Sequence, residues 1–386
     1  MIPYSKQYID KEDTKEVLKI LNSKILTQGP IVEKFEKKIN KYVNCKFSVA
    51  VNSATSGLHI ACLAAGLKKG DFAWTVPITF AATVNCIINC GAKVDFVDID
   101  PETFIISIKN LKKKLIIAKN KGKLPKVIIP VHLGGQPHMQ IELFKLSKKY
   151  KFKIIEDASH SLGAKFKNEK VGSCKWSDFS VFSFHPVKPM TTIEGGIVTT
   201  NNKIFYKKMC LFRNNGITKN YEDFIKKNGK KLPWYYEYQS SGYNYRMHEV
   251  AAGLGISQLK KLNTFIQYRN RVVKEYKKRL RGIPVSFQKI LKFNKSTFHL
   301  LIIQFNLRKT HLTYKKIFDF FRANKIFVNL HYMPLHQSQF LKKNNNNKIL
   351  HNSEVYSKTC MSLPVFYGIK TSQINFVCNK IKEIFK

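Results

Sequence analysis

The chain has 386 residues, 44% of them hydrophobic, which is enough for a large core and for more than one structural unit. Its 67 lysines and arginines outnumber 25 acidic residues, and the formal net charge of +42 would suit a nucleic-acid-binding protein. Only eight of these basic residues are arginines, however, and the lysines are spread along the whole chain. We therefore expect no nucleic-acid partner, although a positive field can attract a phosphate-bearing substrate.

The sequence gives no sign of a membrane or secreted protein. It has no run of about 20 apolar residues, and the start, Met1-Ile2-Pro3-Tyr4-Ser5-Lys6, lacks the apolar core of a signal peptide. The eight cysteines show no C-x-x-C spacing. We expect a cytoplasmic protein with free thiols, no membrane contact and no metal site.

Predicted strands alternate with predicted helices through the first half of the chain. Helices are predicted at 10–21, 31–42, 58–67, 77–89, 141–150 and 205–212, and strands at 47–51, 73–76, 93–97, 126–131, 153–158, 179–182 and 197–200. This alternation predicts an α/β fold with a mainly parallel sheet covered by helices on both faces.

The second half of the chain shows a different pattern of predicted elements. Residues 223–241 are polar and irregular and predict a loop, and residues 249–279 predict one long helix. Beyond it, strands at 297–305 and 326–330 alternate with helices at 314–323 and 373–385, while the four asparagines at 344–347 predict a loop tip without evident function. We therefore predict a large domain at 1–248 with an N-terminal arm, and a long bridging helix with a smaller α/β domain at 249–386.

Several predicted strand ends carry functional groups. The turn at 52–57, Asn-Ser-Ala-Thr-Ser-Gly, opens a helix whose free N–H groups and hydroxyls can bind an anion. An ordinary serine or threonine N-cap explains the same residues equally well. Phe80 follows a second strand and Asp157 ends a third. Because carboxyl ends of parallel strands meet at one edge of a sheet, we expect these groups to share a rim.

Lys188 lies in the middle of the connection between the strands at 179–182 and 197–200, among Ser, His, Pro, Thr and Gly residues. Partial removal from water lowers the pKa of a lysine and makes its amine a usable nucleophile. The alternative is a solvated lysine in a lysine-rich chain, and the unusual neighbourhood favours the nucleophile. A lysine amine, a carboxylate, an aromatic ring and an anion cradle together are what pyridoxal phosphate requires.

The chain resembles the DegT/DnrJ/EryC1/StrS aminotransferases over nearly its whole length. The matching motifs are Leu26-Thr27-Gln28-Gly29-Pro30, Asn52-Ser53-Ala54-Thr55-Ser56, Thr79-Phe80-Ala81-Ala82-Thr83, Glu156-Asp157-Ala158, Ser183-Phe184-His185 to Lys188, Thr191 to Gly196, Gly242-Tyr243-Asn244-Tyr245-Arg246, His331 to His336 and Ser362-Leu363-Pro364. The resemblance implies a fold-type I pyridoxal phosphate enzyme that acts on nucleotide-linked keto-sugars.

The resemblance also implies a role for each cofactor contact. Lys188 would be the catalytic lysine that forms the Schiff base, Asp157 would bind the pyridine nitrogen and Phe80 would stack on the ring. The phosphate contacts would be Thr55, Ser56 and Ser183, with Asn244 reaching over from a neighbouring subunit, so that a homodimer shares its active sites. Ala54 would be a further cofactor contact. His160 stands where most relatives have Gln; it would contact the phenolic oxygen of the cofactor, or else be an ordinary core histidine.

Lys188 itself implies transamination, since some relatives carry His there and act as sugar dehydratases. The motifs around His160 and Lys188 look most like the branch that serves pseudaminic acid biosynthesis. That branch implies ping-pong transfer of an amino group from L-glutamate, through pyridoxamine phosphate, to C4 of a UDP-linked 4-keto-6-deoxy-N-acetyl-hexosamine. The implied substrate contacts are Tyr4, Lys24, Ile25, Leu26, Thr27, Ala54, Ser183, Asn244, His331, Tyr332, Met333 and Pro334.

Three alternatives stay open at this stage. One is an aminotransferase for another nucleotide-linked 3- or 4-keto-sugar, for example of the GDP-perosamine type. A second is a different enzyme on the same scaffold, such as a dehydratase. The third is a non-catalytic binding or regulatory protein, which the basic charge would favour.

Overall fold

A computed structural model describes residues 1–226, 232–342 and 349–386, so the asparagine run at 344–347 and part of the predicted loop at 223–241 lie outside the described residues. The helices are α1 Lys11–Leu21, α2 Pro30–Val43, α3 Ala54–Ala64, α4 Ala81–Asn89, α5 Ile108–Asn120, α6 Gln140–Tyr150, α7 Lys203–Arg213, α8 Glu249–Arg279, α9 Tyr314–Ala323, α10 Gln339–Lys342, α11 His351–Thr359 and α12 Thr371–Glu383. No helix in these described ranges is long and apolar enough to span a membrane.

The central sheet has seven strands in the order β1-β9-β8-β5-β4-β2-β3. They are β1 Phe47–Val51, β2 Phe72–Thr75, β3 Lys93–Phe96, β4 Val127–Ile129, β5 Lys153–Asp157, β8 Phe179–Ser183 and β9 Gly196–Thr200. Neighbouring strands run parallel from β8 to β3, whereas β9 is antiparallel to both β8 and β1. The predicted α/β fold with a mainly parallel sheet is confirmed.

Helices cover both faces of this sheet because its strands are apolar on both sides. Val127 and Ile129 of β4 pack in a core cluster that also holds side chains of α3, α4 and α7. Ile128, between them, belongs to a cluster with α5 and α6. Successive side chains of a strand point to opposite faces, so the sheet separates an α3–α4 side from an α6 side. This division decides where each polar side chain of β5 lies.

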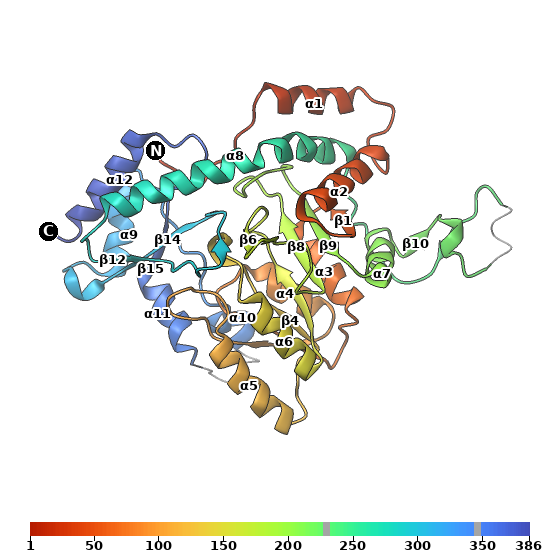
Figure 1. The fold of residues 1–386 in the computed structure, drawn as a ribbon, viewed down its shortest axis with the longest axis horizontal. Helices are drawn as coiled ribbons and strands as arrows, with labels where there is room; N and C mark the ends of the chain where they lie inside the picture. Colours follow the sequence, from red (N-terminus) through yellow and green to blue (C-terminus); the bar gives the residue numbers. More distant parts are fainter. Residues whose placement is uncertain (227–231, 343–348) are drawn as a thin grey trace.

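The long helix α8 joins the central sheet to a C-terminal core (Figure 1). Its first half packs with α2 in one cluster, and Val272, Val273 and Tyr276 near its end pack with α9, α12 and the small sheet β12-β14-β15. The strands of the smaller sheets are β6 Lys165–Phe166, β7 Glu169–Lys170, β10 Ile217–Thr218, β11 Glu237–Tyr238, β12 Val285–Phe287, β13 Asn294–Lys295, β14 Leu301–Phe305 and β15 Cys360–Leu363. The domain boundary between residues 248 and 249 stays a prediction.

Three element predictions were wrong in instructive ways. The helix predicted at 58–67 begins at Ala54, because Ser53 caps it and Gly57 lies inside it rather than in a turn. A Cβ on Gly57 would lie 3.0 Å from Cγ1 of Val181, so the glycine lets α3 press onto β8. The strand predicted at 326–330 forms only isolated bridges, and the strand predicted at 297–305 begins at Leu301.

Two further differences concern the chain between the sheet strands. Helix α5 was not predicted, since lysines interrupt its apolar residues and only a narrow stripe around Leu111 and Leu115 is buried. The polar stretch predicted as loop contains β11, which pairs with β10. Other boundaries agree within a few residues, and α8 and α9 agree completely.

Candidate active site

Lys188 lies in the loop that joins β8 to β9 at the end of the central sheet. Backbone hydrogen bonds hold this loop in shape, with Phe184 N 2.9 Å from Gly195 O and Lys188 N 2.9 Å from His185 O. The Lys188 side chain is half-buried. Loss of water lowers the pKa of Lys188 to about 8, although the negative charge of Asp157 acts in the opposite direction. The amine is thus easier to deprotonate than that of a surface lysine.

Asp157 ends β5 and its side chain lies on the α3–α4 side of the sheet. Thr83 Oγ1 donates a hydrogen bond of 2.6 Å to Asp157 Oδ2, and Ser159 N donates one of 3.2 Å to Oδ1. Thr83 is itself 2.7 Å from the hydroxyl of Thr79, one turn away. We did not predict Thr83 as a site residue. The signal was available, because hydroxyls four residues apart at a helix start face the same way.

Phe80 presents an aromatic ring next to this carboxylate. It stands at the N-cap position of α4, one turn before Thr83, and 60% of its surface is exposed. Its ring centroid lies 5.9 Å from that of Tyr332. A large exposed aromatic ring at the edge of a cluster of polar side chains can pack against a planar ligand.

The first turn of α3 lies close to the start of β9. A Cβ on Gly196 would come within 2.6 Å of Ala54 N, so this position leaves no room for a side chain. Ser183 is the pairing partner of Gly196, which brings its backbone next to Ala54. Thr55 is exposed, whereas Ser56 is buried and its Oγ donates to Asn52 Oδ1 at 2.6 Å.

The structure realises the N-cap interpretation of this turn, and anion binding at the turn stays a prediction. Ser53 is the N-cap, since its Oγ accepts from Ser56 N at 3.2 Å. The first-turn N–H groups that it does not reach, with Thr55 and the nearby Ser183, still form a place where an anion can bind. Asn244 is exposed, and a 2.9 Å hydrogen bond from Asn52 N to Tyr245 O holds its segment beside the turn.

Buried histidines and half-buried tyrosines gather near Lys188. His160 Nε2 is 3.2 Å from the Tyr332 hydroxyl, and Tyr4 packs on His331 with ring centroids 4.9 Å apart. Burial lowers the pKa of His331 to about 3, with a further contribution from Lys188. Burial likewise holds the pKa of His160 well below its usual range, so both rings are neutral near pH 7.

His160 Nδ1 is buried and has no hydrogen-bond partner among the described residues. A buried nitrogen without a partner costs free energy unless a ligand supplies one. His299, which was not predicted, packs on His160 with ring centroids 4.4 Å apart. No sequence signal marked His299, because it lies in a stretch that we predicted as a plain strand.

The remaining predicted substrate contacts lie in two segments, the first exposed throughout and the second with Met333 exposed and Pro334 buried. Lys24, Ile25, Leu26 and Thr27 form a surface loop that Glu249 N holds through a 2.9 Å bond to Leu26 O. The segment of Met333 and Pro334 follows His331, with Met333 63% exposed. A 3.0 Å bond from Leu335 N to Pro77 O fixes that segment beside the turn before Phe80.

These residues fit pyridoxal phosphate. A lysine of lowered pKa, a strand-end carboxylate, an exposed ring and the free first-turn N–H groups of α3 supply its four requirements. The unpartnered His160 Nδ1 offers a further polar contact. The groups come from α3, α4, β5 and the β8–β9 loop, and the fold brings all of them to one end of the sheet.

Comparison with known proteins agrees with this geometry. Residues 7–382 match the model of the DegT/DnrJ/EryC1/StrS aminotransferase family. A Campylobacter jejuni protein named UDP-4-amino-4,6-dideoxy-N-acetyl-beta-L-altrosamine transaminase is 37% identical over 391 aligned positions, covering 100% of this chain and 98% of the relative.

Solved structures are similar over the same length. Helicobacter pylori PseC, an aminotransferase involved in the biosynthesis of pseudoaminic acid, superposes with a TM-score of 0.89 at 31% identity, covering 100% of this chain and 99% of PseC. Spr1654 from Streptococcus pneumoniae, solved in its PMP form, has a TM-score of 0.89 at 25% identity, with coverage of 100% and 99%. The chain belongs to the DegT/DnrJ/EryC1/StrS aminotransferase family.

Proposed function

We propose that this member of the DegT/DnrJ/EryC1/StrS family is a pyridoxal phosphate-dependent aminotransferase of nucleotide sugars. It transfers the amino group of L-glutamate to C4 of a UDP-linked 4-keto-6-deoxy-N-acetyl-hexosamine. The names of its Campylobacter and Helicobacter relatives support the UDP-linked 4-amino sugar as the product. The observation that carries the proposal is the position of Lys188. Its half-buried amine has a pKa of about 8 and experiences the charge of Asp157, at the end of the sheet where the other cofactor contacts meet.

Each residue near Lys188 has a proposed role in holding the cofactor. Lys188 binds it covalently through Nζ, and the Asp157 carboxylate, aligned by Thr83, keeps the pyridine nitrogen protonated. Phe80 covers the ring. When bound, pyridoxal phosphate withdraws electrons from the carbon next to the reacting nitrogen. Ala54, Thr55, Ser56 and Ser183 bind the phosphate, and His160 Nδ1 contacts the phenolic oxygen.

Lys188 also moves the protons of the reaction. With a pKa of about 8, roughly a tenth of its amine is neutral at pH 7, about 300-fold more than for a surface lysine. The neutral Nζ accepts the proton from the α-carbon of L-glutamate, and in the second half of the reaction it returns a proton to C4 of the sugar. The substrate contacts proposed for the sugar nucleotide are Tyr4, the 24–27 loop, Ala54, Ser183, Asn244 and residues 331–334.

We further propose a cytoplasmic homodimer in which Asn244 completes the phosphate site of the partner. Asn244 is exposed beside the turn at 52–57 of its own subunit. The segment that precedes it carries exposed Trp234, Tyr236 and Tyr238. In Figure 1 the β10–β11 arm, which holds these rings, projects from the body of the protein. Exposed aromatic side chains in such an arm favour a protein partner. The eight free cysteines favour a reducing compartment.

The test of the reaction is an assay with L-glutamate and a panel of UDP-, GDP- and dTDP-linked 3- and 4-keto-sugars. We expect amination at C4 of the UDP-linked sugar, identified by mass and NMR, together with release of 2-oxoglutarate. Preferential amination of a GDP-linked or 3-keto sugar would establish the perosamine-type or 3-aminotransferase alternative instead. Dehydration without amino transfer would contradict the proposal.

The shared site can be tested by mixing Lys188→Ala with Asn244→Ala. If Asn244 acts across the interface, each mixed dimer has one site with both native residues. Random exchange should then restore about a quarter of the wild-type sites, because half of the dimers are mixed. If Asn244 acts within its own subunit, the mixture stays as inactive as its components.

A further inference from the structure

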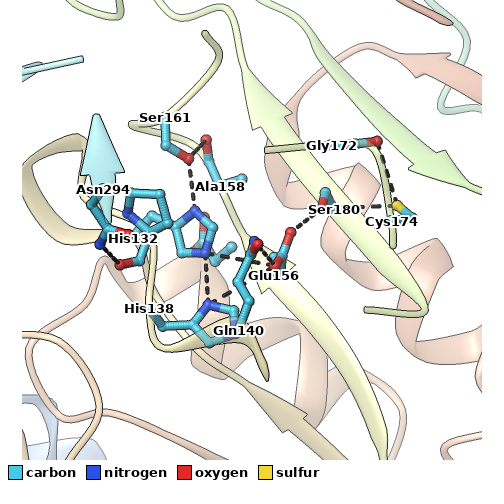
Figure 2. A network of polar contacts seen from close by, with 12 residues as sticks. His132, His138, Gln140, Glu156, Ala158, Ser161, Gly172, Cys174, Ser180 and Asn294 are labelled. Atoms are coloured by element: carbon cyan, nitrogen blue, oxygen red, sulfur yellow. Dashed lines mark hydrogen bonds and ion pairs between the residues drawn. The ribbon is translucent and has the colours of Figure 1, made fainter. Parts of the chain in front are cut away.

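A second cluster of polar side chains surrounds Glu156, as Figure 2 shows. Because successive side chains of a strand point to opposite faces, this cluster lies on the other face of β5 from Asp157. It contains His132, which follows β4, His138 in the loop before α6, and Glu156 of β5. These side chains are 0%, 0% and 1% exposed, respectively. The spacing of the cysteines predicted no metal site, and only the fold brings these three residues together.

The separations between the three atoms match those of metal ligands. His132 Nε2 and His138 Nδ1 are 2.9 Å apart, and each is 3.9 Å from Glu156 Oε1. A point equidistant from three atoms at these separations lies about 2.1 Å from each of them. Transition-metal ions bind imidazole nitrogens and carboxylate oxygens at about 2.0–2.2 Å. A cation therefore fits among them with little movement of the side chains.

The surrounding residues orient His132 and Glu156 as metal ligands are usually oriented, whereas His138 Nε2 is buried without a hydrogen-bond partner among the described residues. His132 Nδ1 is 2.8 Å from Ser161 Oγ, which itself donates to Ala158 O at 3.2 Å and so accepts the imidazole proton. The lone pair of His132 is then on Nε2, facing His138 and Glu156. Gln140 Nε2 donates to Glu156 Oε1 at 2.6 Å, and Ser180 donates to Oε2. Such outer hydrogen bonds fix ligand orientation in metal sites.

A hydrogen-bond network without a cation explains this arrangement less well. One proton shared by the two imidazoles accounts for their 2.9 Å separation, but 3.9 Å is too long for a hydrogen bond from either ring to Glu156. Among the described residues, the only basic side chains within 4 Å of Glu156 are these two histidines, which carry a charge only if protonated. A buried carboxyl group either stays neutral or, when ionised, needs an opposite charge such as a bound cation.

We propose that His132, His138 and Glu156 form a structural site for a divalent transition-metal ion of the Zn²⁺ class. Two neutral imidazoles and one carboxylate suit such ions better than Mg²⁺ or Ca²⁺, which prefer all-oxygen ligands. The ion ties the loop between β4 and α6 to β5, one residue before Asp157. The ion stabilises this end of the sheet and takes no part in the proposed amino transfer.

The test measures metal binding to the cofactor-loaded protein in a buffer free of phosphate and glutamate. After treatment with a chelator, the protein is dialysed against Zn²⁺ and its metal content is determined by mass spectrometry. The same measurement is made on His138→Gln and on the control His336→Gln, which changes a buried histidine outside the cluster. We expect about one Zn²⁺ per protomer in the wild type and the control, and below about 0.1 in His138→Gln.

Substitution with Co²⁺ gives a readout that does not depend on any variant. We expect the intense visible absorption of Co²⁺ with few nitrogen and oxygen ligands, and a higher thermal midpoint than in the metal-free protein. The proposal is overturned if the wild type binds no Zn²⁺, or if His138→Gln binds as much as the control. A sulfur-to-cobalt charge-transfer band would also overturn it, because it would place the metal on cysteines.

Discussion

Asp157 and Glu156 are neighbouring carboxylates on one strand, yet their surroundings differ in every respect that matters for function. Asp157 lies on the α3–α4 side, takes one hydrogen bond from Thr83 and acts on the charge of Lys188. Glu156 lies on the α6 side and is enclosed by Gln140, Ser180 and two histidines. The alternation of side chains along a strand separates the two environments.

The difference shows which feature places a buried carboxyl group at the proposed cofactor site. Both carboxylates are at least 94% buried, so burial alone does not distinguish them. Asp157 is the last residue of its strand, at the end of the sheet where ligands of parallel sheets bind. Glu156 is one position further inside, enclosed by the two histidines of the proposed metal site and by its hydrogen-bond partners Gln140 and Ser180.

Removal of the Lys188 amine should have the largest effect on the Asp157 side. We expect Lys188→Ala to lower the rate of amino transfer by about 10⁴-fold or more, because both the covalent attachment and the proton-transferring base are lost. The measurement is 2-oxoglutarate release together with the absorbance of the bound cofactor. Lys175→Ala, at a half-exposed ion pair with Glu169, is the matched control and should keep wild-type rates.

Loss of the Asp157 charge should rank second. We expect Asp157→Asn to lower kcat by about 10² to 10³-fold, because a neutral amide no longer keeps the pyridine nitrogen protonated. An unchanged kcat would show that Asp157 does not act on the cofactor.

The same variant has a pH signature in the cofactor-free protein. Asp157 favours the charged form of Lys188, so its removal should shift the pKa of Lys188 below the wild-type value of about 8. Acylating reagents attack neutral amines, so the modification rate of Lys188 should rise as the pH increases through that pKa. Peptide mass spectrometry reads the midpoint, with surface lysines near 10.4 as internal references.

Thr83→Val and Gln140→Leu form a matched pair, since each removes one 2.6 Å hydrogen bond from one of the two carboxylates without a large change in volume. For Thr83→Val we expect a fall in kcat of about 10-fold, equivalent to ~1.4 kcal/mol of alignment lost at Asp157. The pH dependence of kcat should also change, whereas a merely structural defect would leave that pH dependence unchanged.

Gln140→Leu should have the smallest effect on catalysis and act on stability instead. We expect kcat within about twofold of the wild type and a free energy of unfolding lower by about 1–3 kcal/mol, because Glu156 loses a buried donor. Urea unfolding of the chelator-treated protein measures this loss. If Gln140→Leu lowered kcat more than Thr83→Val, the Glu156 face of β5 would be the catalytic one, contrary to our proposal.

Local sequence patterns predicted much of the fold and part of the site. Helix α8 has 31 residues with regular apolar spacing, and β1, β8 and β9 are short apolar runs between turn residues, so their patterns had one interpretation. Gly57 was misread because its role is to let α3 approach β8, which depends on a strand more than a hundred residues away. Thr83 and His299 were missed because their importance comes only from what they contact.

The sequence by itself determined the fold class, the unusual setting of Lys188 and the family motifs, because propensity, spacing and residue type are local properties. Only the tertiary structure decided that Thr83 aligns Asp157, that His160 keeps an unpartnered nitrogen, and that His132 and His138 meet Glu156. Those facts depend on distances between segments that are far apart in the chain. The burial that lowers the pKa of Lys188 likewise exists only after the sheet, the helices and the β8–β9 loop have packed together.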